Sequence, residues 1–137
     1  GPFSFADENF PQDKFDGMYN HINKTLGSLP EVTIHRGYSC PVLEKFPDAY
    51  FDWVYLDACH WYEEVKKDLD VLYRKVKPNG FICGHDYVMG NWSKSNKYGV
   101  IESINEFLVK KNWKFVYWTL DFTECNSFAI QRIDTTK

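Results

Sequence analysis

The sequence predicts a layered α/β domain with a largely parallel sheet. Strand-like and helix-like segments alternate along most of the chain, and two strand-like segments follow each other at its end. The 137 residues correspond to one domain, and 44% of them are apolar, which is enough to form a core. Aromatic residues make up 18% of the chain, which excludes an intrinsically disordered protein.

The spacing of apolar residues predicts each element in turn. Helices are expected at residues 13–26, 40–46, 61–77 and 100–109. Strands are expected at residues 32–35, 51–57, 81–84, 113–120 and 127–133, the last two antiparallel. The run 51–57 is apolar apart from acids near its ends, as in a strand covered on both faces. The sequence Pro78-Asn79-Gly80 predicts a turn.

The beginning of the chain differs from the rest in composition. Gly1-Pro2 resembles the remnant of a cleaved affinity tag and is left out of the fold. Residues 3–13 mix aromatic and acidic side chains and are expected to form a loop or arm. Residues 88–98 are polar and are expected to form a loop beside the third predicted strand.

Charge and cysteine content exclude several classes of protein. The chain carries 16 basic and 19 acidic residues, which is not the balance of a nucleic-acid-binding surface. No apolar run approaches the ~20 residues that cross a membrane, and no signal peptide is visible. None of the cysteines has C-x-x-C spacing, so no zinc ribbon is expected. We therefore expect a cytoplasmic protein that binds neither nucleic acid nor membrane.

Polar clusters follow three of the predicted strands. They are Gly37-Tyr38-Ser39, Asp57-Ala58-Cys59-His60 and His85-Asp86-Tyr87. Ligands of open α/β sheets bind beyond the carboxyl ends of the strands, where these clusters would meet. An aspartate at such a position is also a common helix N-cap, and a lone histidine is often an ordinary loop residue. Two strands that both end in Asp and His nevertheless favour a functional site.

Three ordered motifs resemble a known family. Residues 54–65 (VYLDACHWYEEV), with Asp68-Leu69, resemble a "DxxHxYexvxxDl" segment. Residues 75–87 (KVKPNGFICGHDY) resemble "klkpGGxixGHDy", and residues 99–107 resemble "GVxxAvxeF". Together they resemble the C-terminal two-thirds of class I S-adenosylmethionine-dependent methyltransferases, over about residues 32–133. The subgroup is the one that resembles small-molecule or sugar O-methyltransferases.

This resemblance implies a fold and a cofactor. The fold would be a Rossmann-like three-layer sheet, mostly parallel, with an antiparallel hairpin at its C-terminal end. Gly37-Tyr38-Ser39 resembles the loop that lies along the adenine of S-adenosylmethionine. Asp57, with Ala58 beside it, resembles the residue that lies near the methyl donor or a metal.

The resemblance also implies two chemistries at the acceptor side. His85 and Asp86 resemble residues that face the acceptor, and His60 or His85 would act as general base in a metal-free enzyme. In metal-dependent relatives, Asp57, Asp86 and His85, or His60 in its place, would hold a divalent cation such as Mg²⁺. Such a cation would orient an acceptor hydroxyl and lower its pKa.

The chain also departs from the family pattern. It contains no G-x-G loop, and the first two strands with the helix between them have no counterpart. The lack of these strands would expose sheet edges and apolar surface, which favours association. The sequence therefore predicts either a truncated domain or a reduced variant that assembles as a homo-oligomer.

Three functions remain open at this point. The first is methyl transfer to a small-molecule acceptor. The second is a methyltransferase-like module without activity that serves in binding or assembly. The third is a metal-dependent hydrolase built on Asp57, His60, His85 and Asp86. The His-Asp pair of some phosphohydrolases lies on a helix, whereas here it follows an apolar strand, which counts against the third.

Overall fold

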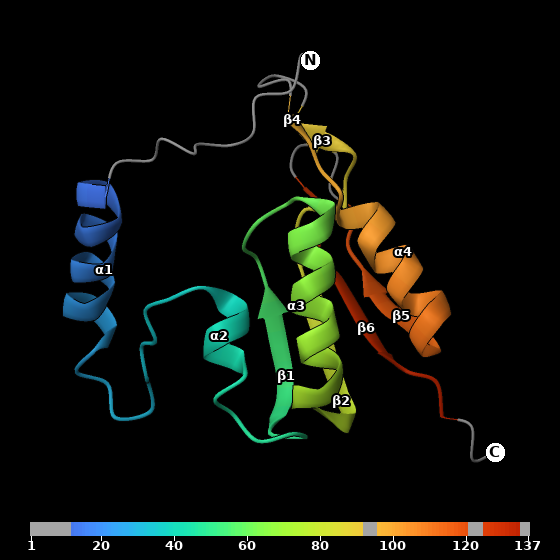
Figure 1. Cartoon of the computed structure of the whole chain (residues 1–137), viewed down its shortest axis with the longest axis horizontal. Helices are drawn as coiled ribbons and strands as arrows, with labels where there is room; N and C mark the ends of the chain where they lie inside the picture. The colour runs from blue at the N-terminus through green and yellow to red at the C-terminus, as the bar shows by residue number, and fades with distance from the viewer. Residues whose placement is uncertain (1–11, 92–95, 121–124, 135–137) are drawn as a thin grey trace.

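The computed structural model describes residues 12–91, 96–120 and 125–134 (Figure 1). The tag-like Gly1-Pro2 and most of the expected arm at 3–13 lie outside these ranges. The described helices are α1 (Gln12–Leu26), α2 (Ser39–Leu43), α3 (Tyr62–Lys75) and α4 (Val100–Lys111). The main strands are β1 (Phe51–Leu56), β2 (Val76–Gly84), β5 (Trp113–Trp118) and β6 (Phe128–Arg132). Part of the expected polar loop forms a small hairpin, β3 (Gly90–Asn91) with β4 (Asn96–Lys97).

The sheet confirms the predicted fold class. Its strands lie in the order β1-β2-β6-β5, and β1 is parallel to β2. Strand β6 is antiparallel to both of its neighbours, so β5 points the same way as β1 and β2. The result is a mixed α/β fold whose sheet is mostly parallel, with an antiparallel closing pair. None of the described helices is long and apolar enough to cross a membrane.

The core lies between the sheet and the two long helices α3 and α4. The fully buried side chains are Leu69, Leu72, Val76, Ile82, Ile104 and Ile130. Helix α3 contributes the stripe Val65, Leu69 and Leu72, at the three- and four-residue spacing of one helix face. Phe128 lies across Gly84, where a Cβ would come within 2.5 Å of the ring, so glycine is required there.

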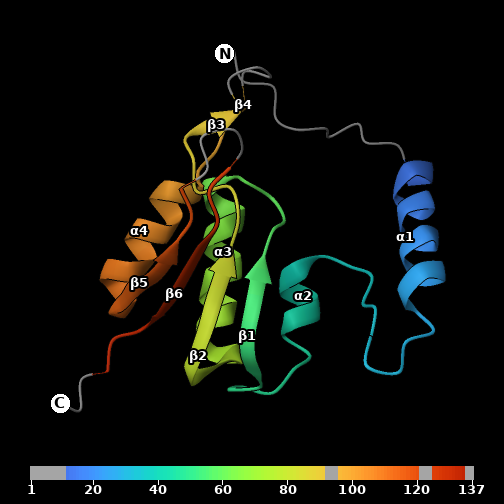
Figure 2. The same ribbon diagram turned by 180° about the vertical axis from the view of Figure 1, so that it is seen from behind.

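Among the described residues, helices α3 and α4 cover one face of the sheet and no helix covers the other (Figure 2). Strands β1, β2 and β5 follow one another in the same direction across the sheet. Because both connections between these parallel strands are right-handed crossovers, helices α3 and α4 lie on the same face. The expectation that strand 51–57 is covered on both faces is therefore wrong. Trp53 is 62% exposed, and Tyr55 is exposed beside it. The expected third layer is not present in the described part of the chain.

Two local predictions are also corrected. Residues 32–35 are not a strand, because a strand needs a hydrogen-bonded neighbour and no described strand pairs with them. Pro78-Asn79-Gly80 lies inside β2 at a register shift, where Phe51 pairs with Val76 but Trp53 pairs with Phe81. The turn-forming residues thus produce an irregularity within the strand. A Cβ on Gly80 would lie 2.6 Å from the carbonyl oxygen of Asp52.

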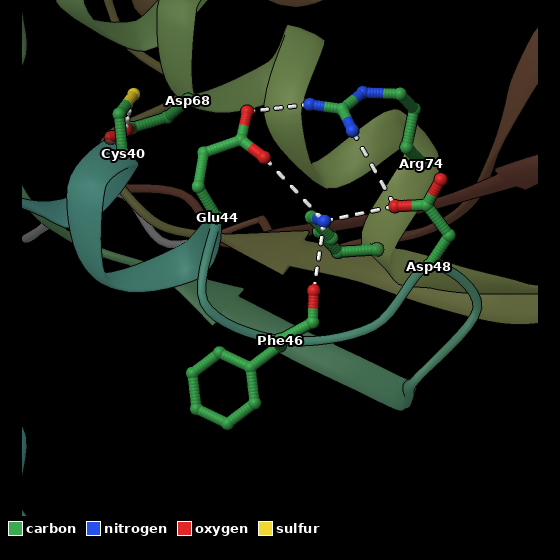
Figure 3. A network of polar contacts seen from close by, with 7 residues as sticks. Cys40, Glu44, Phe46, Asp48, Asp68 and Arg74 are labelled. Carbon is green, nitrogen blue, oxygen red and sulfur yellow. Dashed lines mark hydrogen bonds and ion pairs between the residues drawn. The ribbon is translucent and has the colours of Figure 1, made fainter.

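A polar network fixes the segment that leads into β1 (Figure 3). The buried Lys75 donates from Nζ to the Phe46 carbonyl at 2.8 Å and to Asp48 Oδ1 at 2.9 Å. Arg74 bonds Glu44 at 2.5 Å. The Ala49 amide also donates to the Arg74 carbonyl. The C-terminal end of α3 therefore holds the residues that lead into β1 and positions the start of that strand.

Candidate functional site

The candidate site lies where β1 and β2 end side by side. Leu56 pairs with Gly84 at the last register position, and the His85 amide donates to the Leu56 carbonyl at 3.3 Å. The residues after these strands, Asp57 and Asp86, therefore emerge at the same sheet edge. This is the edge at which ligands bind in open α/β sheets.

Three side chains converge there. One ligand atom from each of Asp57, His60 and Asp86 lies within 4.8 Å of the other two. His60 Nε2 lies 2.7 Å from Asp86 Oδ2, and His85 Nδ1 lies 3.4 Å from the same oxygen. Asp86 is buried, His60 is half-buried and Asp57 is exposed. The structure thus brings the sequence-predicted residues together, with His60 rather than His85 beside both carboxylates.

Asp86 has a left-handed backbone conformation, with φ of +58°. Aspartate and asparagine are among the few non-glycine residues that adopt it readily. The Val88 amide donates to the Asp86 carbonyl at 2.7 Å, and the Tyr87 amide donates to the Asn126 carbonyl at 3.0 Å. This tight turn ends β2 and holds the Asp86 carboxylate within reach of His60. Such strain is common at functional sites.

A second segment holds His60 from the side of α4. The Gly99 amide donates to the His60 carbonyl at 2.7 Å, and the Tyr98 ring lies 4.4 Å from the imidazole. A Cβ on Gly99 would lie 2.4 Å from the Tyr62 amide nitrogen, so only glycine permits this approach. Ser103 Oγ donates to the Tyr62 carbonyl at 3.0 Å. The start of α4 is therefore fastened to the loop that carries His60.

Tyr98 is a site residue that the sequence did not indicate. Burial raises the pKa of its hydroxyl, and the negative charge of Asp86 and then Cys125 raise it further. Tyr98 therefore remains neutral at physiological pH. The only sequence signal near Tyr98 is the third family-like motif, which begins at the next residue, Gly99.

The arrangement can act chemically in two ways. With the Nε2 proton donated to Asp86, the lone pair of His60 is on Nδ1, which can then accept a proton. Alternatively, Asp57, His60 and Asp86 offer two carboxylate oxygens and one imidazole nitrogen to a divalent cation. A cation bound there would replace the His60–Asp86 hydrogen bond, so the two modes exclude each other.

The cavity at this site is small. It measures about 10 Å³ and is lined by Asp57, Ala58, Cys59, His60 and His85, among others. That volume suits one water molecule or an ion. Pockets for small molecules measure roughly 300–1,000 Å³. The described residues therefore leave a cavity at this edge that is too small to enclose an acceptor.

The predicted adenine loop lies at the start of α2. Tyr38 is 87% exposed, so its ring is free to stack on a planar group. Ser39 Oγ donates to Asp68 Oδ1 at 2.5 Å, and Cys40 Sγ donates to the same oxygen at 3.1 Å. Asp68 is buried on α3 and appears with Cys40 in Figure 3. Ser39 thus fastens α2 to α3 in this structure.

The comparisons with known proteins agree with the fold. A family model described as a methyltransferase domain matches residues 6–87. The match begins at residue 6, whereas the three motifs of the sequence analysis indicated a resemblance only from about residue 32. No curated protein matches the chain in a sequence search.

Solved structures are similar in fold at low sequence identity. A SAM-dependent methyltransferase from Aquifex aeolicus is 16% identical, with a TM-score of 0.59 over 90% of this chain and 65% of that one. A candidate type 11 methyltransferase from Sulfolobus solfataricus is 10% identical, with a TM-score of 0.60 over 96% and 70%. A candidate DNA modification methylase from Thermus thermophilus, complexed with S-adenosyl-L-methionine, is 16% identical, with a TM-score of 0.52 over 72% and 54%. The chain thus spans about half the length of the Thermus structure.

Proposed function

Because the chain belongs to the family of methyltransferase domains, we propose that it transfers a methyl group from S-adenosylmethionine to a hydroxyl oxygen of a small molecule. The observation that carries this proposal is the 2.7 Å contact between His60 Nε2 and Asp86 Oδ2 at the end of the parallel strands. A carboxylate that orients an imidazole is a common arrangement for a general base.

In the proposed reaction His60 accepts the acceptor's proton on Nδ1, while Asp86 holds the ring and stabilises the imidazolium that forms. S-adenosylmethionine, when bound, supplies a methyl group on a sulfonium sulfur, which retains the electron pair of the S–C bond as the O–C bond forms. Proton removal makes the acceptor oxygen more nucleophilic. The His60–Asp86 pair supplies this function without a metal.

The side chains at the predicted cofactor surface can bind the chemical groups of S-adenosylmethionine. The exposed Tyr38 ring can stack on an adenine, and the exposed Asp57 carboxylate can accept hydrogen bonds from hydroxyl or amino groups. Gly37, Ser39 and Ala58 complete the predicted cofactor surface.

A divalent cation is the alternative to His60 as general base. Asp57, His60 and Asp86 form a donor set of two carboxylates and one imidazole. Mg²⁺ prefers oxygen ligands, so a mixed set of this kind suits Mn²⁺ at least as well. A cation there would bind the acceptor oxygen and lower the pKa of its hydroxyl.

Calorimetric titration of the full chain with S-adenosylmethionine and S-adenosylhomocysteine, with and without Mg²⁺ or Mn²⁺, tests the proposal. We expect a micromolar dissociation constant, equivalent to about −8 kcal/mol. Screening of acceptors with His60→Asn would then test the base, and His21→Asn is the matched control because His21 lies exposed on α1. Retained transfer in His60→Asn would exclude His60 as the base.

The second candidate is a binding or assembly module without activity. The cavity of about 10 Å³ at the candidate site favours it. It predicts no heat with either cofactor form and no change in Tm. That result would leave membership of the family intact and exclude the enzyme. A metal-dependent hydrolase would instead be indicated by phosphatase activity that a chelator abolishes.

A further inference from the structure

A second cavity lies between helices α3 and α4, away from the candidate site. The two helices lie side by side on one face of the sheet (Figure 1). The cavity measures about 180 Å³, and it shares no lining residue with the small cavity at the ends of β1 and β2. Leu69 and Phe107 are buried residues of its lining and give it an apolar side. Pockets for drug-sized ligands measure roughly 300–1,000 Å³, so this cavity suits a smaller molecule.

Charged side chains make up most of the remaining lining. The basic ones are Lys66, Lys110 and Lys111, and the acidic ones are Asp70 and Glu106. Three ammonium groups and two carboxylates leave one positive charge in excess at neutral pH. The whole chain carries a net charge of −3, so this positive excess is a local property of the cavity.

Glu106 holds two of the three lysines close together. Lys66 Nζ lies 3.6 Å from Glu106 Oε1, and Lys110 Nζ binds the same oxygen. The Tyr62 hydroxyl donates to the other oxygen, Oε2. Hydrogen bonds from Lys110 and then from Tyr62 lower the pKa of Glu106 to about 2, so this side chain is charged at neutral pH. One carboxylate thus serves two ammonium groups, and both of its oxygens already accept hydrogen bonds.

Lys111 is paired less closely than the other two lysines. Its Nζ lies 3.8 Å from Asp70 Oδ1, which is longer than a hydrogen bond, and 4.7 Å from the centre of the Tyr73 ring. Each ammonium group carries three N–H donors and no acceptor. The lining therefore has hydrogen-bond donors to spare, whereas the oxygens of Glu106 are in use. A ligand that complements this lining carries a negative charge and accepts hydrogen bonds.

We propose that this cavity binds a small organic oxyanion, a carboxylate or a phosphate monoester, whose short apolar part lies against Leu69 and Phe107. The oxyanion accepts charge-assisted hydrogen bonds from Lys66, Lys110 and Lys111 and balances the charge of the lining. No covalent bond forms or breaks, so the cavity is a binding site and not a second catalytic site. All three lysines are partly exposed, so water and salt screen their charges, and we expect a dissociation constant in the millimolar range.

The cavity is connected to the loop that carries His60, although it lies outside the candidate site. Ser103 belongs to the lining, and its Oγ donates to the Tyr62 carbonyl at 3.0 Å. The Tyr62 hydroxyl in turn donates to Glu106, and Tyr62 follows His60 by two residues. A bound oxyanion therefore contacts residues that also fasten α4 to the start of α3. Its binding needs neither S-adenosylmethionine nor a methyl acceptor, so it can be measured independently of methyl transfer.

NMR titration of the full chain, labelled with ¹⁵N, tests the proposal with butyrate, butyl phosphate and butylammonium at constant ionic strength. We expect the amide signals of Ser103 and Phe107 to move with at least one of the oxyanions and to stay in place with butylammonium. A response to butyl phosphate alone supports a phosphate monoester as the ligand, and a response to butyrate alone supports a carboxylate. Inorganic phosphate should bind more weakly than butyl phosphate, because it has no apolar part. No response to either oxyanion, or an equal response to butylammonium, overturns the proposal.

Two variants with opposite expected effects test the role of charge. Glu106→Gln removes the carboxylate that competes for the lysines and should strengthen oxyanion binding at least about twofold. Lys111→Met removes one ammonium group and should weaken binding about two- to fivefold. The matched control is Lys67→Met, because Lys67 follows Lys66 on α3, pairs with Glu64 and does not line the cavity. The amide spectrum itself shows whether each variant is folded. Equal affinities of wild type, Glu106→Gln and Lys111→Met overturn the proposal, as does a loss in Lys67→Met as large as that in Lys111→Met.

Discussion

The rings of His60 and Tyr98 lie 4.4 Å apart between centroids and are inclined by 31°. The two residues belong to segments that the Gly99–His60 hydrogen bond joins. With Tyr98 against one side of the imidazole, the ring has little freedom to turn away from Asp86. Tyr98 therefore positions the proposed base without being required to touch the acceptor.

Replacement of Tyr98 tests this positioning role. Tyr98→Leu should remove the aromatic contact, release the imidazole and lower the transfer rate about tenfold, whereas Tyr98→Phe keeps the ring and the rate. Proton NMR offers a measurement that needs no substrate. The His60 Hε1 signal should move in Tyr98→Leu and stay in place in Tyr98→Phe. Equal signals in the two variants would contradict the role.

Asp86→Asn tests the carboxylate of the pair. Asparagine also adopts positive φ, so the turn at +58° should persist and Tm should change little. Loss of the charge should lower the transfer rate by about 10²–10⁴, because the imidazolium is no longer stabilised. Thermal unfolding and initial rates measure the two effects separately. A large fall in Tm together with the loss of activity would indicate that Asp86 has a purely structural role.

Gly99→Ala tests the contact between the start of α4 and the His60 loop. The new Cβ would lie 2.4 Å from the Tyr62 amide nitrogen, and this overlap should cost about 1–3 kcal/mol in the free energy of unfolding. Gly17→Ala in α1 is the matched control, because its Cβ meets nothing within 4 Å. That change should leave stability equal or up to about 1 kcal/mol higher. Urea unfolding measures both, and equal stability of the two variants would contradict the close approach.

Replacement of Lys75 should lower the free energy of unfolding more than replacement of its neighbour Arg74. Lys75→Met removes a charged hydrogen bond to the Phe46 carbonyl from a buried side chain and should cost about 1.5–3 kcal/mol. Arg74→Met removes ion pairs of a side chain that is 44% exposed and should cost under about 1 kcal/mol. Urea unfolding compares them. A larger loss of stability in Arg74→Met than in Lys75→Met would contradict the central role of Lys75 in this network.

Cys40 should make stability depend on pH in the alkaline range. Burial, together with the Asp68 carboxylate, raises the pKa of its thiol from 9.0 to about 11. The native state thus favours the neutral thiol. Its contribution to stability is fully present below pH 9 and is lost as the pH rises from 9 to about 11. Unfolding midpoints of wild type and Cys40→Ser should converge over this interval.

The same shift of the Cys40 pKa predicts an order of alkylation. At mildly alkaline pH the exposed Cys59 should react with iodoacetamide well before Cys40, because only the thiolate is the nucleophile. Peptide mass spectrometry follows the two sites in one sample. Equal labelling rates would show that Cys40 is neither shielded from solvent nor bonded to Asp68.

The sequence by itself determined the order of the main helices and strands from residue 51 onward and the edge at which the candidate site lies. Apolar spacing depends on local periodicity, so it predicted helices at residues 61–77 and 100–109, which the structure has at Tyr62–Lys75 and Val100–Lys111. Asp57 and Asp86 each follow an apolar run, and parallel neighbours must end at the same edge. These conclusions need only the geometry of a helix and of a strand.

Tertiary structure decided which groups meet. Residues 32–35 are not a strand because no described strand pairs with them, and residues 78–80 form an irregularity within β2, which continues past them along β1. Both histidines lie near Asp86, but His60 is the closer at 2.7 Å and is the one grouped with Asp57, and the Tyr98 ring against it comes from a distant segment. Within the described part of the chain, the direction of the crossovers placed both long helices on one face of the sheet. Such contacts depend on strand pairing and chain reversal between distant segments, which no local pattern of residues encodes.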